Sequence, residues 1–374
     1  MEIIKVSSKK DLIRFIKFPF KLYEHDQHWV APLIFEQIRF FDPKLNPYYE
    51  HSEVQLFLAL DGKNIVGRIS AQTNRNHNKV HQDKVGFFGF FETIDDQAVA
   101  NALLATAEKW LFEKGFDTMR GPASLSVNDE CGLLIDGFDS SPMVLMSYNQ
   151  PHYIRLLENS GFYKAMDLYA YATQVSPPPA RLKRLADRLE KRDRFTIRAL
   201  NSRNKRKLRG DIEKIFQLYE TAWEKNWGYV PMTDKEFDQL VNKLLPIIIP
   251  ELIFIAEIDG NAVGISVTLP DYNYVLHKMR GKIFPLGWLK FLYHRNKIPN
   301  LRVTIMGVLP EYKNRGIDAV MYCKSFEAAK KQKNNFQIAE FSWILETNSM
   351  MNKIANPLNA KIYKTYRLYD RKIK

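Results

Sequence analysis

The residues with the clearest chemistry form a short basic loop, Lys313-Asn314-Arg315-Gly316-Ile317-Asp318. The loop follows an apolar strand predicted over 303–309, which Pro310 ends because proline has no amide hydrogen for a sheet ladder. A helix is predicted after the loop, from about Asp318 to Lys333. The free amides and the positive dipole end of a helix N-terminus favour phosphate groups. The pattern predicts a site for a phosphate-bearing cofactor; an ordinary basic turn is the alternative.

A second polar stretch runs from Gly121 to Tyr153 and is long for a connection between elements. Long ordered loops are often functional. We interpret this stretch as the place where an acceptor molecule binds, with hydrogen bonding inside the loop as the alternative. The candidate side chains are those of Asn128, Glu130, Tyr148 and Asn149.

The elements that position the basic loop form a regular series over 195–374. In order, the pattern predicts a strand at 195–200, helices at 205–225 and 234–245, a hairpin turning at Asp259-Gly260-Asn261, the strand and helix of the basic loop, a strand over 337–345, a short helix over 348–356 and a strand over 361–369.

Residues 54–175 repeat the later part of this series and end in a strand over 164–174. The repeat is clearest at the two hairpins, where residues 59–67 match 257–264. In the earlier copy, however, the loop over 92–97 has no glycine and carries three carboxylates, Glu92 among them. Such a loop would repel a phosphate. We therefore expect only the later copy to bind a phosphate-bearing cofactor.

The chain has 374 residues, a formal net charge of +13 and a pI of about 9.4, which suggest two domains and an anionic partner. Cofactor phosphates, a membrane surface and RNA all fit, and solubility alone is the alternative. Much of the positive charge lies between Arg181 and Lys214, which we interpret in part as a linker helix with a solvated face. Cys131 and Cys323 form no disulfide or zinc pattern, so a reducing cytoplasm fits.

A basic and aromatic segment over 278–297 precedes the strand of the basic loop. Its composition suits a membrane interface or a long acyl chain, and packing as core is the alternative. No apolar run approaches the ~20 residues that span a bilayer. We expect a cytoplasmic protein, with 282–297 as a peripheral contact to the inner face of the membrane.

The order Val308-Leu-Pro310 and then Lys313-Asn-Arg315-Gly316-Ile-Asp318 resembles the acetyl-CoA signature of the GNAT acyltransferase superfamily, Val-x-Pro followed by Gln/Arg-x-x-Gly-x-Gly/Ala. Lys313 and Asp318 depart from that signature. The whole chain resembles the tandem-GNAT proteins of the YghO-like bacterial family, whose wider relatives include bacterial ceramide synthase-like N-acyltransferases. The segments that carry this resemblance are Gly121-Pro122, Ser126-x-Asn128-x-Glu130-x-Gly132, Asp136-Gly137-Phe138, Tyr148-Asn149, Leu156-Leu157-Glu158-x-x-Gly161-Phe162, Glu346-Thr-Asn348 and Lys364-x-x-Arg367-x-Tyr369.

The resemblance implies an α/β fold of two GNAT-like mixed-sheet lobes in tandem. It implies a degenerate lobe over 1–176, a linker over 177–194 and an acyl-CoA-binding domain over 195–374. The implied activity is transfer of an acetyl or longer acyl group from CoA to an amine, with a lipid-like amine as one possibility and no metal. The alternatives are a Fem-type transferase that uses aminoacyl-tRNA, which the positive charge would suit, and a GNAT-derived binding protein without catalysis.

The same resemblance implies roles for individual residues. CoA would be held by Met306, Val308, Lys313, Asn314, Arg315, Gly316, Ile317 and Asp318. A backbone N–H of the 306–308 strand would polarise the thioester oxygen. Glu346 is the first candidate for the base that takes the proton of the amine, and a carboxylate at a helix entry is its alternative. Asn348 is a further catalytic candidate, and Tyr363 is a candidate for the acid.

Overall fold

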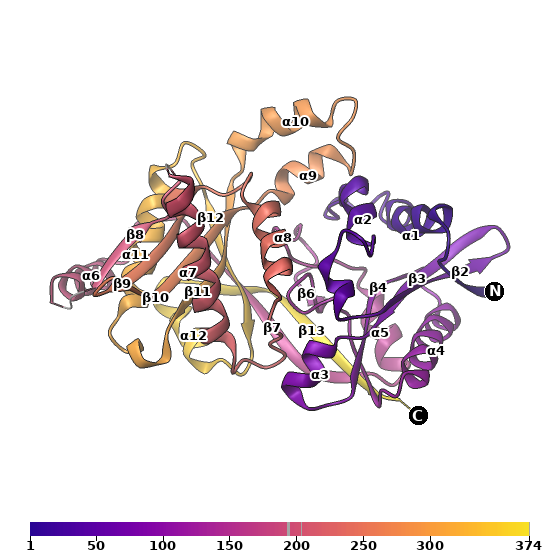
Figure 1. Cartoon of the computed structure of the whole chain (residues 1–374). Helices are drawn as coiled ribbons and strands as arrows, with labels where there is room; N and C mark the ends of the chain where they lie inside the picture. Colours follow the sequence, from indigo (N-terminus) through magenta and orange to yellow (C-terminus); the bar gives the residue numbers. More distant parts are fainter. Residues whose placement is uncertain (193–194, 203, 374) are drawn as a thin grey trace.

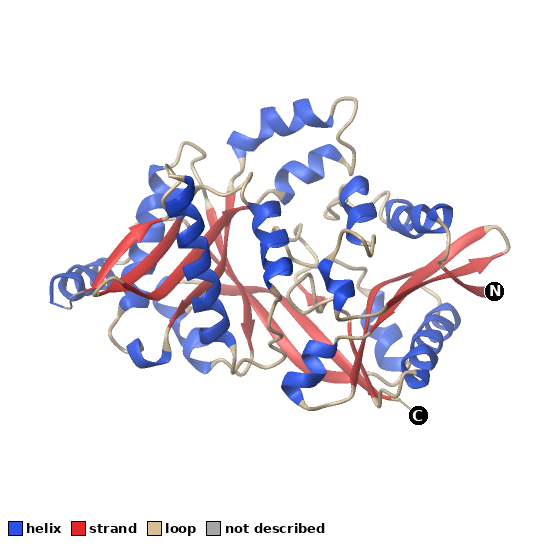
Figure 2. Cartoon of the chain, viewed as in Figure 1, coloured by secondary structure: helices blue, strands red, loops and turns tan. Residues whose placement is uncertain are grey.

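The computed structural model describes residues 1–192, 195–202 and 204–373, and these form one mixed sheet with helices on both faces (Figures 1 and 2). The sheet has 13 strands in the described residues, in the order β1-β2-β3-β4-β5-β13-β7-β12-β11-β10-β9-β8, with β6 beside β13. The strands are β1 (Glu2–Lys5), β2 (Val54–Asp61), β3 (Asn64–Gln72), β4 (Val85–Thr93), β5 (Thr118–Gly121), β6 (Leu133–Asp136), β7 (Tyr163–Gln174), β8 (Phe195–Ala199), β9 (Ile253–Ile258), β10 (Asn261–Pro270), β11 (Asn300–Val308), β12 (Ile338–Leu345) and β13 (Lys361–Lys372). This architecture confirms the predicted fold class.

The helices lie on both faces of the sheet. They are α1 (Lys9–Leu22), α2 (Ile34–Phe40), α3 (Arg75–His81), α4 (Gln97–Glu113), α5 (His152–Asn159), α6 (Ala180–Arg192), α7 (Lys205–Trp223), α8 (Asp234–Leu244), α9 (Asn273–Met279), α10 (Gly287–His294), α11 (Ile317–Lys331) and α12 (Ser349–Ile354). Ile255 of β9 packs with α7, whereas the next residue, Ala256, packs with α11. Because successive strand residues point to opposite faces, α7 and α11 lie on opposite faces of the sheet.

The two copies are joined through their last strands. β7, the last strand of the first copy, pairs with β12 on one side and with β13 on the other. β13, the last strand of the chain, pairs with β5 of the first copy. β7 thus lies between two strands of the second copy, β13 lies between two strands of the first copy, and the sheet is continuous across them.

The basic segment after the first copy forms helix α6, which packs against α11 on one side. Ala186 and Leu189 of α6 lie in one buried cluster with Ile317 and Val320 of α11. Lys324 pairs with Glu190 at 2.9 Å and so joins the two helices at their surface. The solvated face that we predicted is therefore only one side of α6, and the last two residues of the predicted linker, 193–194, lie outside the described residues.

Two pairs of parallel strands, β4–β5 and β11–β12, separate along their length. β11 and β12 pair only over Asn300–Val303 and Ile338–Phe341. A bulge at Thr304 then interrupts the pairing of β11 with β10, and β11 diverges from β12. β4 and β5 likewise pair only over Val85–Phe87 and Thr118–Arg120. We call the diverging part of each pair its splay.

Candidate active site

The N-terminus of α11 is open to an anion. Gly316 precedes the helix in the left-handed region at φ 74°, and no side chain of the described residues caps the helix there. Lys313, Asn314 and Arg315 are exposed just before it. The structure thus places the predicted basic loop at a helix end whose amides and dipole favour phosphate.

The matching helix of the first copy is closed by its own residues. Asp96 caps α4 and accepts hydrogen bonds from the N–H groups of Ala98 and Val99, at 2.7 and 3.3 Å. A carboxylate therefore already occupies the place of an external anion. Asp95, the other carboxylate of this loop, forms an ion pair with Arg155.

Glu92 does not belong to that loop, which corrects the assignment from the sequence. It lies in β4 and is buried, with hydrogen bonds from the hydroxyls of Tyr23 (2.7 Å) and Tyr153 (2.8 Å) and an ion pair to Arg68 (3.6 Å). Burial raises the pKa of Glu92, and Arg68 acts in the opposite direction. Glu92 thus stabilises the interior of the first copy rather than repelling a ligand at its surface.

The splay of the first copy is filled in the same way. The chain that follows β5 bonds to β4, with Ala123 N–H donating to Phe88 O at 2.9 Å. Farther along, the hydroxyl of Tyr153 accepts a hydrogen bond from Thr93 N–H at 2.9 Å. The backbone groups that a ligand would use between β4 and β5 are therefore already bonded.

In the splay of the second copy, backbone N–H groups of β11 point into the gap between the two strands. Leu309 N–H donates across to Val263 O of the neighbouring hairpin at 2.9 Å. Because alternate N–H groups of a strand point to the same side, those of Val308 and Met306 point away from β10 and toward the splay. Their side chains pack with α11. Both residues were predicted from the sequence to contact the cofactor.

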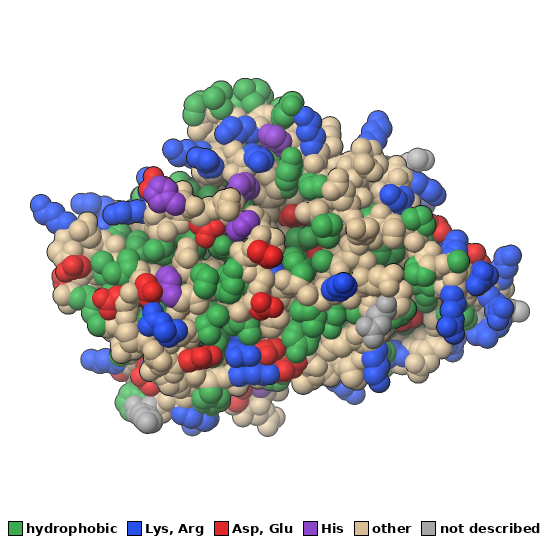
Figure 3. Space-filling view, turned by 180° about the vertical axis from the view of Figure 1, so that it is seen from behind, with side chains coloured by type: hydrophobic (Ala, Val, Ile, Leu, Met, Phe, Trp, Pro, Cys, Tyr) green, Lys and Arg blue, Asp and Glu red, His purple; other side chains and the backbone are tan. Residues whose placement is uncertain are grey.

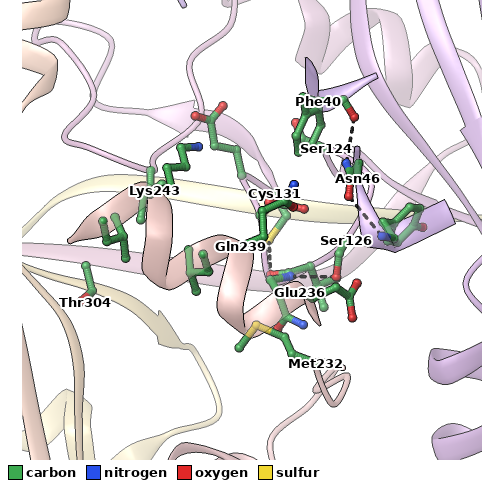
Figure 4. A pocket seen from close by; sticks show the side chains of 18 of the residues that line it. Phe40, Asn46, Ser124, Ser126, Cys131, Met232, Glu236, Gln239, Lys243 and Thr304 are labelled. Atoms are coloured by element: carbon green, nitrogen blue, oxygen red, sulfur yellow. Dashed lines mark hydrogen bonds between the residues drawn. The ribbon is translucent and has the colours of Figure 1, made fainter. Parts of the chain in front are cut away.

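A cavity of about 1000 Å³ lies between the two copies and reaches this splay. Its floor includes Thr304 and Ile305 of β11 with Ser342 and Trp343 of β12, all beyond the point where these strands part. One wall is α8, none of whose side chains is fully buried. Figure 4 shows Glu236, Gln239 and Lys243 of α8 opposite Ser124, Ser126 and Cys131 of the first copy.

Most of the cavity wall is apolar or aromatic. The first copy contributes Phe35, Phe40 and Phe90, and the second contributes Tyr219, Trp223, Trp227, Leu240, Leu244, Val267 and Leu269. The rings of Tyr219 and Trp223 stack with centroids 5.2 Å apart. The exposed residues at the rim, among them Phe35, Leu45 and Lys235, place the mouth between segment 35–50 and α8. Such a cavity suits a ligand with a long apolar part.

Four carboxylates of the first copy line this cavity: Glu36, Glu50, Asp129 and Glu130. Burial raises the pKa of both Asp129 and Glu130, that of Asp129 to about 7. The charge of Lys243 on α8 opposes the shift in each case. The positive charge of Arg302, which also lines the cavity, opposes the rise in the pKa of Glu130 as well. Glu130 is exposed and lines the cavity.

A buried polar network supports the floor. Arg302 donates to the hydroxyl of Ser342 at 2.9 Å and to Val144 O at 2.6 Å, and it lies 3.4 Å from Glu340. Glu340 is fully buried and also accepts hydrogen bonds from Ser342 and Tyr363. Tyr363, predicted as an acid, is therefore connected to the cavity through Glu340 and Ser342.

The other predicted residues fall in different places. Asn128 and Glu130 line the cavity, and Asn128 bonds to Val230 O at 2.9 Å. The remaining four residues are not among those that line the cavity. The carboxylate of Glu346 accepts hydrogen bonds from Lys164 (2.6 Å) and from Asp167 N–H (3.1 Å), and Asn348 caps α12 by accepting from Met351 N–H (3.2 Å). The hydroxyl of Tyr148 donates to Asp26 (3.0 Å), and the side chain of Asn149 accepts from Leu134 N–H (2.7 Å).

Sequence reasoning missed several residues of the cavity. Asp129 stands between two of the predicted residues. Arg302 is a charged residue inside a largely apolar strand, and that contrast is the sequence signal from which it could have been predicted. Tyr219 and Trp223 have the spacing of an ordinary helix core. Their role at the cavity becomes visible only when the two copies are placed together.

In the part of the chain that the structure describes, no group of three or more His, Cys, Asp and Glu side chains is arranged to hold a metal ion. None of the helices described has both the length and the apolar character needed to cross a bilayer.

The mixed sheet and the splayed parallel strands, present in both copies, together with the basic, uncapped helix end of the second copy, define a tandem GNAT protein. Solved structures share this fold. A tandem GNAT protein from the clavulanic acid biosynthesis pathway, without AcCoA, aligns with a TM-score of 0.59 and 8% identity over 100% of this chain and 98% of its own. A GCN5-related N-acetyltransferase from Sphaerobacter thermophilus aligns with a TM-score of 0.53 and 14% identity, over 100% and 96%. Identities this low establish the fold alone.

Two relatives at higher identity establish the family. Protein YghO of Escherichia coli (strain K12) is 36% identical over 374 residues, covering 98% of this chain and 94% of the relative. Bacterial ceramide synthase of Caulobacter vibrioides is 34% identical over 376 residues, covering 99% and 97%. No model of a protein family matches the chain. The chain belongs to the family of these two proteins, as the resemblance in its motifs predicted.

Proposed function

We propose that the protein is an acyl-CoA-dependent N-acyltransferase whose one CoA site lies in the second copy. The observation that carries the proposal is the difference between the copies. In the first, Asp96 caps the helix and Tyr153 bonds the backbone of the splay, whereas the helix end at Gly316 is uncapped. The open splay also adjoins a cavity large enough for an acceptor.

The residues of the second copy would divide the work of transfer. The loop Lys313–Asp318 would hold the CoA phosphates, and the thioester would lie in the splay, where N–H groups of Met306 and Val308 can donate to its carbonyl oxygen. The acceptor nitrogen attacks the carbonyl carbon, the C–N bond forms and the C–S bond breaks. The nitrogen loses a proton and CoA leaves as the thiol. Alignment of the two partners supplies much of the acceleration.

We propose Glu130 as the group that takes this proton. It lines the cavity, which reaches the splay, and burial raises its pKa toward the range in which a carboxylate is an effective base. Asp129 beside it would hold the protonated amine before reaction. Glu346 remains a candidate, but its carboxylate is bonded to Lys164 and to a backbone amide. Tyr363 would hold the buried network beneath the cavity floor through its hydrogen bond to Glu340, and Asn348 would order the helix after β12.

The acceptor that we propose is an amine with a long apolar chain. The cavity combines carboxylates with an extended aromatic and aliphatic wall, which matches an amine head and a lipid-like tail. A relative that shares 34% identity is named bacterial ceramide synthase, and a ceramide is an N-acylated long-chain amine. Such an acceptor resides in a membrane, and segment 282–297 is the part of this chain that we propose to reach one.

Calorimetric titration with CoA and acyl-CoA tests the cofactor site. The double variant Lys313→Ala/Arg315→Ala should weaken CoA binding at least tenfold, because two exposed cations leave the helix end that faces the phosphates. Lys330→Ala/Lys331→Ala is the matched control, since it removes the same charge from the exposed far end of the same helix. An equal loss in both variants, or no CoA binding by the wild type, would contradict the proposal.

The same preparation separates the two other functions that the sequence allowed. Salt-sensitive binding of aminoacyl-tRNA in the absence of CoA binding would indicate a Fem-type transferase. CoA binding without transfer to long-chain amines or other primary amines would indicate a binding protein. Transfer detected as amide product and free thiol supports the proposal.

A further inference from the structure

The helical hairpin α9–α10 exposes large apolar side chains on a projection of the molecule (Figure 1). Phe284 is 77% exposed and Tyr293 63% exposed, values unusual for side chains of this size. The other exposed apolar residues of the hairpin are Leu286, Trp288, Leu289 and Leu292. Exposed apolar residues gathered in one segment, rather than scattered singly, mark a surface that is covered in function.

These side chains have a defined direction. Trp288, Leu289, Leu292 and Tyr293 are exposed, and at 100° per residue they cover one side of α10. Phe291 points the other way and stacks on Tyr272 of the hairpin base at a centroid distance of 5.9 Å. The hairpin is thus fixed to the body by one face and presents the other outward.

The charge around this face has one sign. Between residues 272 and 310 the chain has no Asp or Glu, and its six exposed cations there are Lys278, Arg280, Lys282, Lys290, Arg295 and Lys297. Figure 3 shows hydrophobic side chains at the top of the projection with Lys and Arg side chains around them. An apolar centre with a cationic border is complementary to an anionic lipid surface.

The face adjoins the mouth of the cavity. Ile34 N–H at the start of α2 donates to Gly281 O of the hairpin at 3.3 Å. The next residue, Phe35, is 45% exposed and lines the cavity. The hairpin and the start of α2 are therefore in contact, and Phe35 lies beside both the hairpin and the mouth of the cavity.

We propose that α10, the loop Phe284–Leu286 and Phe35 together form a docking face for a bilayer with anionic headgroups. This places the cavity mouth at the membrane surface, so that a long-chain amine passes from the bilayer into the cavity; that purpose rests on the proposed function. A second copy of the chain is the less suitable occupant, because a two-fold contact would bring two cationic borders together.

Vesicle sedimentation with the full-length protein, without CoA or amine, tests the docking face. We expect binding to vesicles of phosphatidylcholine mixed with phosphatidylglycerol, and at least tenfold weaker binding to phosphatidylcholine alone or at high salt. Trp288→Ser/Leu292→Ser should reduce the binding at least tenfold. Phe112→Ser is the matched control, because Phe112 is 59% exposed on α4, outside the hairpin. The control should bind as the wild type does.

Several outcomes would overturn the proposal. One is wild-type protein that stays in solution with both kinds of vesicle, and another is equal loss of binding in the hairpin and control variants. A dimer in analytical ultracentrifugation that Trp288→Ser/Leu292→Ser dissociates would show an interface between copies instead. Because no catalysis enters this assay, its failure is distinguishable from failure of the proposed function, which transfer to an amine dissolved in detergent micelles measures separately.

Discussion

At the scale of single residues, two of the cavity carboxylates differ from the acidic groups of the interior. Glu92 and Glu340 are buried with an arginine and hydroxyl donors around them. Asp129 and Glu130 instead face a cavity, with raised pKa values. Asp129 is half-buried and Glu130 is exposed to the cavity, and carboxylates with shifted pKa values in a cavity are candidates for functional groups.

Replacing Glu130 with Gln should lower the rate of transfer by about a hundredfold or more, because general-base catalysis contributes about that much. The amide keeps the shape of the side chain but cannot take the proton of the amine. The affinity for CoA, measured by calorimetry, should stay within about twofold because Glu130 belongs to the other copy. Glu346→Gln is the comparison, and a larger loss of kcat in that variant would return the role of base to Glu346.

Replacing Asp129 with Asn should stabilise the folded protein at about pH 8. The pKa of Asp129 is raised to about 7 in the folded chain, so the stability tied to its protonated form is present at acidic pH and is lost as the pH rises through about 7. The variant avoids that loss, and we expect a gain of ~1 kcal/mol, kept small because the side chain still meets cavity water.

Urea unfolding of wild type and Asp129→Asn across pH 5 to about 9 measures this gain. The difference in the free energy of unfolding should grow with pH, while the affinity for an amine acceptor falls. A variant that is less stable than the wild type at every pH would show instead that Asp129 has a purely structural role.

At the scale of elements, α4 and α11 show how one fold makes a closed and an open helix end. Asp96 supplies its own anion to α4, whereas Gly316 leaves the amides of α11 to an external one. The left-handed backbone of Gly316 and its tight fit against α6 are both part of that open end. A Cβ atom at position 316 would come within 2.2 Å of the Leu189 side chain.

Gly316→Ala should therefore destabilise the fold by about 1–2 kcal/mol from backbone strain alone, with a further cost from the contact with Leu189. In a protein that already carries Leu189→Ala, Gly316→Ala should cost only the free energy of the backbone strain, because the side chain it would contact has been removed. Urea unfolding of the four proteins gives both terms. Additive changes in the free energy of unfolding would mean that α6 does not press on the loop. Gly316→Trp is a less suitable test of CoA binding, because its large side chain would displace α6, and a loss of binding could then result from the disturbed fold.

Features that depend on neighbouring residues can be predicted from this sequence, whereas features that depend on residues far apart in the chain cannot. The hairpins, the loop at Gly316 and the unequal loops of the repeat are local features, and each was readable from adjacent residues. Asn128 and Glu130 were found because they stand in a long polar loop, but their place in a cavity depends on α7 and α8 of the other copy. The bond of Arg302 to Val144 and the pairings of the closing strands join residues more than a hundred positions apart, which local patterns do not encode.

At the scale of the whole molecule, the exchange of closing strands makes the two copies one folding unit. Residues 1–176 alone would leave one edge of β5 and both edges of β7 unpaired, because β12 and β13 both lie outside that fragment. Without β7, residues 177–374 would lose the partner of both β12 and β13. Unpaired inner strands expose backbone groups and apolar side chains, which favours aggregation over folding.

We therefore expect that neither 1–176 nor 177–374 gives a folded protein when expressed alone, and that co-expression of the two yields a soluble complex that binds CoA. The full chain should unfold in a single cooperative transition, with near-ultraviolet circular dichroism and tryptophan fluorescence changing together in urea. A proteolytic nick within α10 of the folded full-length chain serves as the control, because it cuts a projection and no strand of the sheet, so the two pieces should stay associated. A folded and monomeric 177–374 that binds CoA by itself would refute the interdependence of the copies and would make the first copy an accessory to the acceptor cavity alone.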